Sequence, residues 1–286
     1  MKIQRIIILA VVFVVLSQCK KNTEEPYSNV DIVMDNAQAT LYFHTVFCEA
    51  EYAWAFADIN KYEDKTIADP KRKLTYLHNS KEKANDSVAI EYNDYVLKNY
   101  LSLTGKIIVT FDNDSSYRKI SKKASILLDD FSINGQSVIG EATITYRKTA
   151  TIPNDQYTYT LLNGANIREA GTSAILISCV IANGQYERIK ENNNPDGDDD
   201  DDNIWVYTGD MTGTLLNDPN LKYTNTVPAS SYTLNGETKD GKIRFTKDCS
   251  IASEGLSLIK IAKRPDILYF YNCEELYFES TEHHIR

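Results

Sequence analysis

The sequence predicts a mainly β protein: an antiparallel meander of about ten or more strands, curled, with one N-terminal helix packed on it. From about residue 104 onward, the chain consists of runs rich in β-branched and aromatic residues, many of them alternating with polar residues. Asn-Gly pairs, which favour tight hairpin turns, separate several of these runs. A single segment with helical spacing precedes them.

The helix is predicted from about residue 36 to residue 60. Its apolar residues recur at spacings of four, three, four and three, which place them on one face of a helix. These residues are Phe43, Phe47, Ala50, Trp54 and Ala57. Asp35 or Asn36 is a suitable N-cap, and Pro70 prevents the helix from continuing much beyond residue 69. We expect the aromatic face to pack against the sheet rather than to bind a cofactor.

The strands follow one another with short connections. Between about residues 61 and 103 the only strand predicted is Val88–Tyr92. Further along the chain, Ala142, Ile144 and Tyr146 alternate with polar neighbours, so we expect one face of the sheet to be exposed to solvent. Type I′ turns need positive φ at both central residues, so the Asn-Gly pairs predict hairpins. The pairs are Asn134-Gly135, Asn163-Gly164, Asn183-Gly184 and Asn235-Gly236.

The first residues have the features of an export signal. Lys2 and Arg5 precede an unbroken apolar run from Ile6 to Leu16. As a helix this run would rise about 16 Å, roughly half of the ~30 Å hydrocarbon core of a membrane. It is too short for a spanning helix and suits the apolar part of a secretory signal.

Leu16-Ser17-Gln18-Cys19 resembles the bacterial lipobox. This resemblance implies that Cys19 becomes a new N-terminus carrying diacylglycerol, and that residues 1–18 are removed as a lipoprotein signal peptide. Gln18 departs from the small residue usual at that position, and ordinary secretion with cleavage after Ser17 is the alternative. Residues 19–34 would then be a polar tether, and residues 35–286 a single helix-plus-β domain.

Charge and leader together predict a location. Loss of residues 1–18 removes Lys2 and Arg5 and leaves 29 basic against 40 acidic residues, a net charge of −11. This balance disfavours nucleic acid as a partner, and membrane binding should rest on acyl chains. We expect a lipid-anchored protein of the cell envelope, located at the outer membrane. The stretch KKNTEE after Cys19 loosely resembles signals that send lipoproteins to the cell surface.

Four further cysteines allow at most two disulfides in an oxidising compartment. They are Cys48, Cys179, Cys249 and Cys273, and none forms a C-x-x-C pair that would favour zinc or redox chemistry. Cys249 and Cys273 lie within one C-terminal sheet segment and are the favoured disulfide. Two buried free thiols are the alternative.

Several stretches together resemble a family of uncharacterised secreted lipoproteins of the Bacteroidota. They are DNAQATLYFHTVF, GKIIVTF, DDFSINGQSVIGEATIT, WVYTGDMTGTLL and DCSIASEGLSLIKI…DILYFYNCEELYF. The chain resembles a divergent member. YLSLTGKI replaces the family's glycine-rich approach to GKI, and Tyr271-Asn272-Cys273-Glu274 replaces its Tyr-Gly-x-Cys-Asp. The resemblance implies a location and a fold, but no activity.

No catalytic motif emerges from the residues. Gly255-Leu256-Ser257-Leu258-Ile259 lacks the second glycine of a nucleophile elbow, and neither a phosphate-binding glycine loop nor H-E-x-x-H is present. His44, on the helix, and His78, His283 and His284 are each expected to be structural or solvent-facing. Neighbouring acids such as Asp129 and Asp130 would point to opposite faces of a strand, which does not make a hydrolytic pair.

An acidic run, NNNPDGDDDDDNIW, is predicted to be a solvated loop between two strands. The alternative is a Ca²⁺ site with oxygen ligands from Asp196, Asp198, Asp200 and Asp202. The EF-hand spacing fails, because Asn203 and Gly209 occupy the positions that need Gly and Glu. No other cofactor is predicted.

Nineteen tyrosines and two tryptophans raise the question of a glycan-binding aromatic surface, although we expect most of them in the core. The favoured function is a non-catalytic binding or structural module at the cell envelope, with a glycan or protein partner. A structural variant of this function would accept a partner's strand at a sheet edge. A hydrolase acting on envelope or dietary polysaccharide is the alternative.

Overall fold

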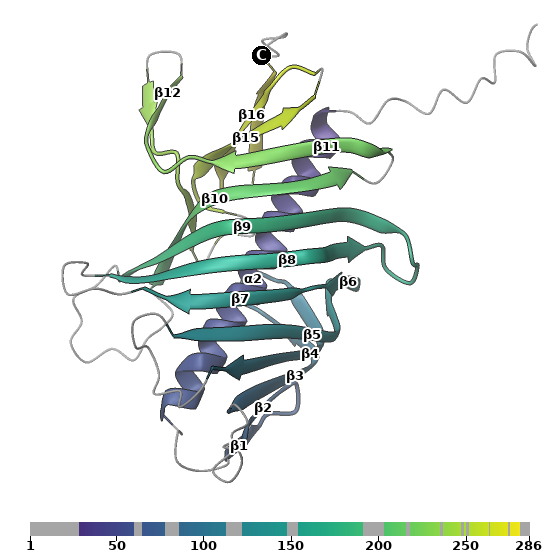
Figure 1. Cartoon of the computed structure of the whole chain (residues 1–286), viewed down its shortest axis with the longest axis vertical. Coiled ribbons are helices and arrows are strands. Elements are labelled where there is room, and N and C mark those ends of the chain that lie inside the picture. Colours follow the sequence, from purple (N-terminus) through teal and green to yellow (C-terminus); the bar gives the residue numbers. More distant parts are fainter. Residues whose placement is uncertain are drawn as a thin grey trace, which may run out of the picture.

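A computed structural model shows a mainly β protein with one N-terminal helix packed on a large antiparallel sheet (Figure 1). The fold class predicted from the sequence is therefore confirmed. The structure describes residues 29–59, 65–77, 86–112, 122–147, 154–190, 203–215, 218–234, 237–246, 249, 252–262, 264–273 and 275–280.

The helix and strands have the following bounds: α2 (Asn29–Ile59), β1 (Lys65–Ala68), β2 (Arg72–Leu77), β3 (Ser87–Val96), β4 (Ser102–Phe111), β5 (Lys123–Ile133), β6 (Gln136–Ile139), β7 (Glu141–Tyr146), β8 (Asp155–Arg168), β9 (Ile175–Lys190), β10 (Asn203–Leu215), β11 (Asp218–Val227), β12 (Tyr232–Leu234), β13 (Glu237–Lys239), β14 (Ile243–Phe245), β15 (Gly255–Ile261), β16 (Ile267–Asn272) and β17 (Glu275–Ser280).

The strands form one 15-stranded sheet, and β12 and β13 form a separate two-stranded hairpin. Neighbours in sequence are mostly neighbours in the sheet, as a meander requires. The first half of β10 pairs with β14 and the second half with β11, so the sheet divides there. Helix α2 crosses the strands on one side, from β11 near its N-terminal end towards β4 near its C-terminal end (Figure 1). It contacts β2–β4, β9, β16 and β17, so the sheet curls around it.

The predicted apolar face of the helix is confirmed, since all five of its predicted residues are buried. Phe47 lies at its centre, stacked on Tyr186 of β9 with ring centroids 3.9 Å apart. The helix begins at Asn29 rather than near residue 36. Ile32 and Val33, which lie in the predicted tether, are buried in the core, and this burial accounts for the earlier start.

Only some of the Asn-Gly pairs form the predicted hairpins. Asn134-Gly135 is the tight turn between β5 and β6, with φ of 50° and 77°. Asn163-Gly164 and Asn183-Gly184 instead lie inside β8 and β9, at shifts in the strand register. The hairpin prediction is wrong at both pairs, because each pair lies at a β-bulge within a long strand. At Gly184 glycine is needed for space, since a Cβ there would lie 2.9 Å from the Ile181 side chain. Asn235-Gly236 lies outside the described residues, between the paired strands β12 and β13.

Aligned irregularities bend the sheet. Asp94, Gly105 and Asp130 all have positive φ and lie at the register shifts of the neighbouring strands β3, β4 and β5. Gly209 of β10 lies against Gly184 of β9 at a second such place. Bulges increase the local twist and bend of a strand, so these positions help the sheet curl around α2.

Cys249 and Cys273 form a disulfide with Cα atoms 4.6 Å apart, the pair favoured from the sequence. It ties the segment after β14 to the end of β16. Cys48 and Cys179 are free thiols, half-buried and buried respectively. Among the described residues, no helix combines the length and apolar character needed to cross a membrane.

Candidate functional site: a groove beside the helix

A groove of about 360 Å³ runs along the side of α2 that the curled sheet leaves open. The turn between β3 and β4 forms one wall, and β10 and β14 form the other. Its lining mixes aromatic, charged and thiol side chains: His44, Thr45, Cys48, Glu49, Tyr52, Arg72, Tyr95, Val96, Leu97, Lys98, Asn99, Trp205, Phe245 and Thr246. This size and mixture are typical of small-molecule sites.

An ion pair fixes one side of the groove. Arg72 of β2 donates to the Glu49 carboxylate of α2 at 2.6 Å, and the Tyr92 hydroxyl donates to the same oxygen at 2.5 Å. The Arg72 guanidinium lies 4.0 Å from the ring centroid of Tyr52 and 5.2 Å from that of Tyr95. Burial alone would lower the pKa of Arg72, but the Glu49 carboxylate raises it, so the guanidinium remains charged.

A second buried network lies on the sheet side of the helix. Arg188 of β9 pairs with Asp155 of β8, and its other terminal nitrogen lies 3.7 Å from Glu51 of α2. Tyr157 donates to Glu51 at 2.9 Å, and Tyr146 donates to Asp155 at 2.8 Å. These bonds satisfy charges that would be costly to bury alone.

His44 and Cys48 are one helical turn apart and in contact, with 3.4 Å between Cys48 Sγ and His44 Nε2. The His44 ring stacks on Phe245 at a centroid distance of 3.6 Å. Burial lowers the pKa of His44 to about 3. Burial, together with the carboxylates of Glu49 and Glu51, raises the pKa of Cys48 well above its usual range. The pair is therefore a neutral imidazole and a neutral thiol at pH 7, a poor nucleophile.

The structure brings few of the predicted site residues together. His44 lines the groove. Asp129 pairs with Lys106 at 2.9 Å, and Asp130 occupies the neighbouring bulge on the sheet surface. The predicted lipidation site Cys19, the candidate calcium ligands Asp196, Asp198, Asp200 and Asp202, and the histidines His78, His283 and His284 lie outside the described residues. In the described part of the chain, no group of three or more His, Cys, Asp or Glu could hold a metal ion.

Most tyrosines are buried, as expected. Among the described residues, Tyr52 is 38% exposed and Tyr100 is 84% exposed, while Tyr95 and Trp205 are half-buried and line the groove. The roles of Arg72 and Glu49 were not predicted from the sequence. A signal was available, because Glu49 and Glu51 interrupt the apolar stretch VFCEAEYAWAF, where an acid needs a buried partner.

Comparison of the chain with protein-family models, curated proteins and solved structures finds no match.

Proposed function

We propose that the protein is a non-catalytic binding module of the cell envelope, anchored through a lipid on Cys19, and that the groove beside α2 binds a neutral saccharide. One observation carries the binding proposal: aromatic side chains and a fixed Arg72–Glu49 pair converge on a partly open groove of saccharide size. The location rests on the leader and on the resemblance to secreted lipoproteins of the Bacteroidota, of which this chain would be a divergent member.

The chemistry of the groove suits a sugar ring. A pyranose has an apolar C–H face that packs on the electron-rich face of an aromatic ring, here Tyr52, Tyr95 or Trp205. Its hydroxyls both donate and accept hydrogen bonds, which matches a guanidinium beside a carboxylate. Because Glu49 already holds Arg72 in position, the polar groups are ordered before the ligand arrives, which lowers the entropy cost of binding.

Hydrolysis of a glycan is the alternative function, but it has less support. An acid–base mechanism needs two carboxyl groups across the scissile bond, with one of them able to carry a proton. Glu49 lines the groove, but its carboxylate already pairs with Arg72 and accepts a hydrogen bond from Tyr92. The neutral thiol of Cys48 beside a neutral His44 does not provide an activated nucleophile.

Calorimetric titration with a panel of neutral disaccharides (maltose, cellobiose, lactose and sucrose) tests the binding site. We expect saturable binding of at least one sugar, weakened at least tenfold by Tyr52→Ala and by Trp205→Ala. Tyr100→Ala is the matched control, because Tyr100 is 84% exposed and does not line the groove. Equal loss of affinity in all three variants would contradict a site in the groove, as would the absence of binding to every sugar.

Labelling of cells with a palmitate analogue tests the anchor separately. The full-length chain should incorporate the label and fractionate with membranes, and Cys19→Ala should do neither, because the acylated sulfur would be lost. Label retained in Cys19→Ala would contradict the proposal that this residue is the lipid attachment site.

A further inference from the structure

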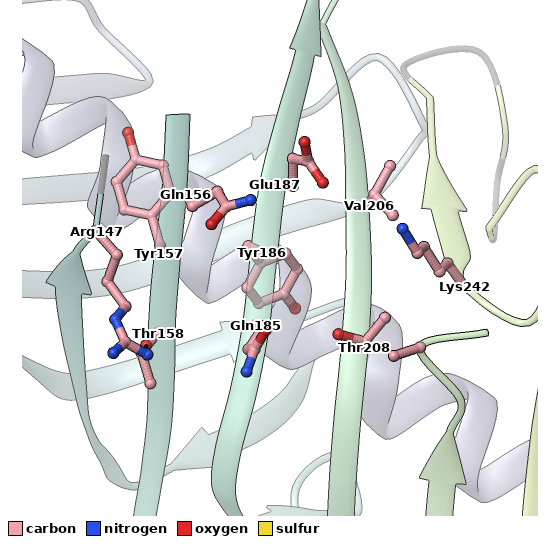
Figure 2. A pocket seen from close by; sticks show the side chains of 11 residues that line it. Arg147, Gln156, Tyr157, Thr158, Gln185, Tyr186, Glu187, Val206, Thr208 and Lys242 are labelled. Carbon is pink, nitrogen blue, oxygen red and sulfur yellow. Dashed lines mark hydrogen bonds between the residues drawn. The ribbon is translucent and has the colours of Figure 1, made fainter. Parts of the chain in front are cut away.

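A second cleft, also of about 360 Å³, lies on the face of the sheet that points away from the helix (Figure 2). Its floor is formed by β8, β9 and β10. Tyr157 and Tyr186 contact Phe47 of α2 and therefore face the helix. Side chains alternate along a strand, so Gln156, Gln185 and their partners on this floor face the opposite way.

The floor presents two rows of side chains that run across the strands. In one row, Gln156 pairs with Glu187, which in turn pairs with Val206. In the neighbouring row, Thr158 pairs with Gln185, which pairs with Thr208. Apart from Val206, these are amide, hydroxyl and carboxylate groups. Together they can donate and accept hydrogen bonds along the whole width of the cleft.

A cationic side chain stands at each end of these rows. Arg147 follows β7 and donates from Nη1 to the Thr158 hydroxyl at 3.2 Å. Lys242 precedes β14 and points toward Val206 (Figure 2). From β7 across β8, β9 and β10 to β14 there are four strand spacings, about 19 Å in a flat sheet. The cleft is therefore elongated across the strands, with positive charge at both ends.

Between these cations lies an acid. Glu187 accepts a hydrogen bond from Asn154 at 2.7 Å and occupies the middle of its row. A ligand matching this arrangement carries hydroxyl donors in its middle and negative charge towards its ends. A nucleic acid places a phosphate at every step and would be repelled by Glu187. A neutral sugar would make no use of the two cations.

We propose that this cleft binds a short acidic oligosaccharide, with its hydroxyls on Gln156, Glu187 and Gln185 and its carboxylates paired with Arg147 and Lys242. Charge-assisted contacts at the two ends would fix orientation, and the polar floor would select hydroxyl-bearing chains over other polyanions. This cleft is on the opposite face of the sheet from the groove beside α2. The proposal for the cleft therefore does not depend on the proposal for the groove.

Calorimetric titration of the full chain with the trisaccharide glucuronate–N-acetylglucosamine–glucuronate tests this inference at low and at physiological salt. This trisaccharide carries a carboxylate on each end sugar and none on the middle sugar, which would lie at Glu187. We expect saturable binding that weakens about tenfold in Arg147→Ala and in Lys242→Ala. Tyr52→Ala, which alters the other groove, should leave the affinity unchanged. Lys222→Ala is the matched control, because it removes one exposed cation outside the cleft. Thermal unfolding of each variant confirms that it is folded, and the methyl NMR signals of Val206 and Thr208 should shift on binding.

Three results would overturn the proposal. The first is no saturable binding of this trisaccharide to the intact chain. The second is equal affinity for its methyl-esterified form, which has the same sugar skeleton without the charges. The third is equal affinity for triglutamate with the same dependence on Arg147 and Lys242, which would make the cleft a general polyanion site.

Discussion

Two charged residues of α2 determine how polar groups are arranged around the helix, at the groove and in the core. Glu49 and Glu51 are two positions apart, so they lie on different sides of α2 and take different arginines, Arg72 and Arg188. The first pair borders the groove and the second is enclosed by the sheet. One helical segment thus supplies both a polar group at the groove and a buried network for the core.

Replacement of Arg188 tests the energetic role of the enclosed network. Arg188→Met leaves the carboxylates of Asp155 and Glu51 without their shared guanidinium, and we expect a loss of about 3–5 kcal/mol in the free energy of unfolding. Urea denaturation measures this loss. The triple variant Arg188→Met, Asp155→Asn, Glu51→Gln should recover part of it, because no ionised carboxylate remains. A single variant as stable as the parent would contradict this account.

Because His44 is buried in its neutral form, we expect the folded protein to lose stability in acid. The pKa of His44 is about 3 in the folded protein against 6.5 for an ordinary histidine, because burial disfavours the charged ring. Between these values the unfolded chain holds a proton that the folded chain does not, so stability falls as the pH drops from 6.5 towards 3. The expected cost is about 2–3 kcal/mol at pH 4.5.

His44→Phe should remove this loss while keeping the stack on Phe245. The measurement is the difference in unfolding free energy between parent and variant at pH 7.5 and pH 4.5. Burial also raises the pKa of Asp35 to about 6, which acts with the opposite sign between pH 3.8 and 6. Asp35 is present in both proteins and cancels in the comparison. Identical pH dependence of the two proteins would contradict a buried neutral His44.

At the scale of helices and strands, the periodicity of apolar residues correctly predicted elements that bury one face. The spacing of Phe43, Phe47 and Trp54 identified the helix, because these side chains meet the sheet. The start of the helix and the internal Asn-Gly pairs were predicted wrongly. Ile32 and Val33 look isolated in the sequence and are buried only because the sheet extends over them. An Asn-Gly pair within β9 is distinguished from a hairpin only by the strands beside it.

Gly105 offers a direct test of the bend in the sheet. Its φ is +94°, and a Cβ there would collide with the backbone carbonyl of Asp130 on the neighbouring strand. We expect Gly105→Ala to destabilise the protein by about 3 kcal/mol or more, because strain and overlap add. Gly171→Ala is the matched control: its φ is +71°, but nothing lies within 4 Å of the added methyl. Its cost should be about 1 kcal/mol. If chemical denaturation shows the same loss of unfolding free energy in both variants, the close approach of the neighbouring strand does not explain why residue 105 is glycine.

At the scale of the whole molecule, the fold class followed from the sequence but the site did not. The groove combines α2, the turn after β3, and strands β10 and β14, which lie far apart in the chain. Their proximity depends on how far the sheet curls, a property set by bulges on many strands together. Arg72 and Trp205 carry no local pattern that marks them as neighbours. The predicted leader, in contrast, rests on a local sequence pattern, so its prediction does not depend on how the chain folds.

The central claim is that the groove beside α2 is a saccharide-binding site, and tryptophan fluorescence tests it most directly. The chain has two tryptophans: Trp54 is 2% exposed in the core, and Trp205 lines the groove. In a Trp54→Phe variant, Trp205 is therefore the sole tryptophan. Titration of that variant with the neutral disaccharides should give a saturable change in Trp205 emission that disappears on adding Tyr52→Ala. Unchanged emission across the whole panel, in a variant shown to be folded, would contradict the claim.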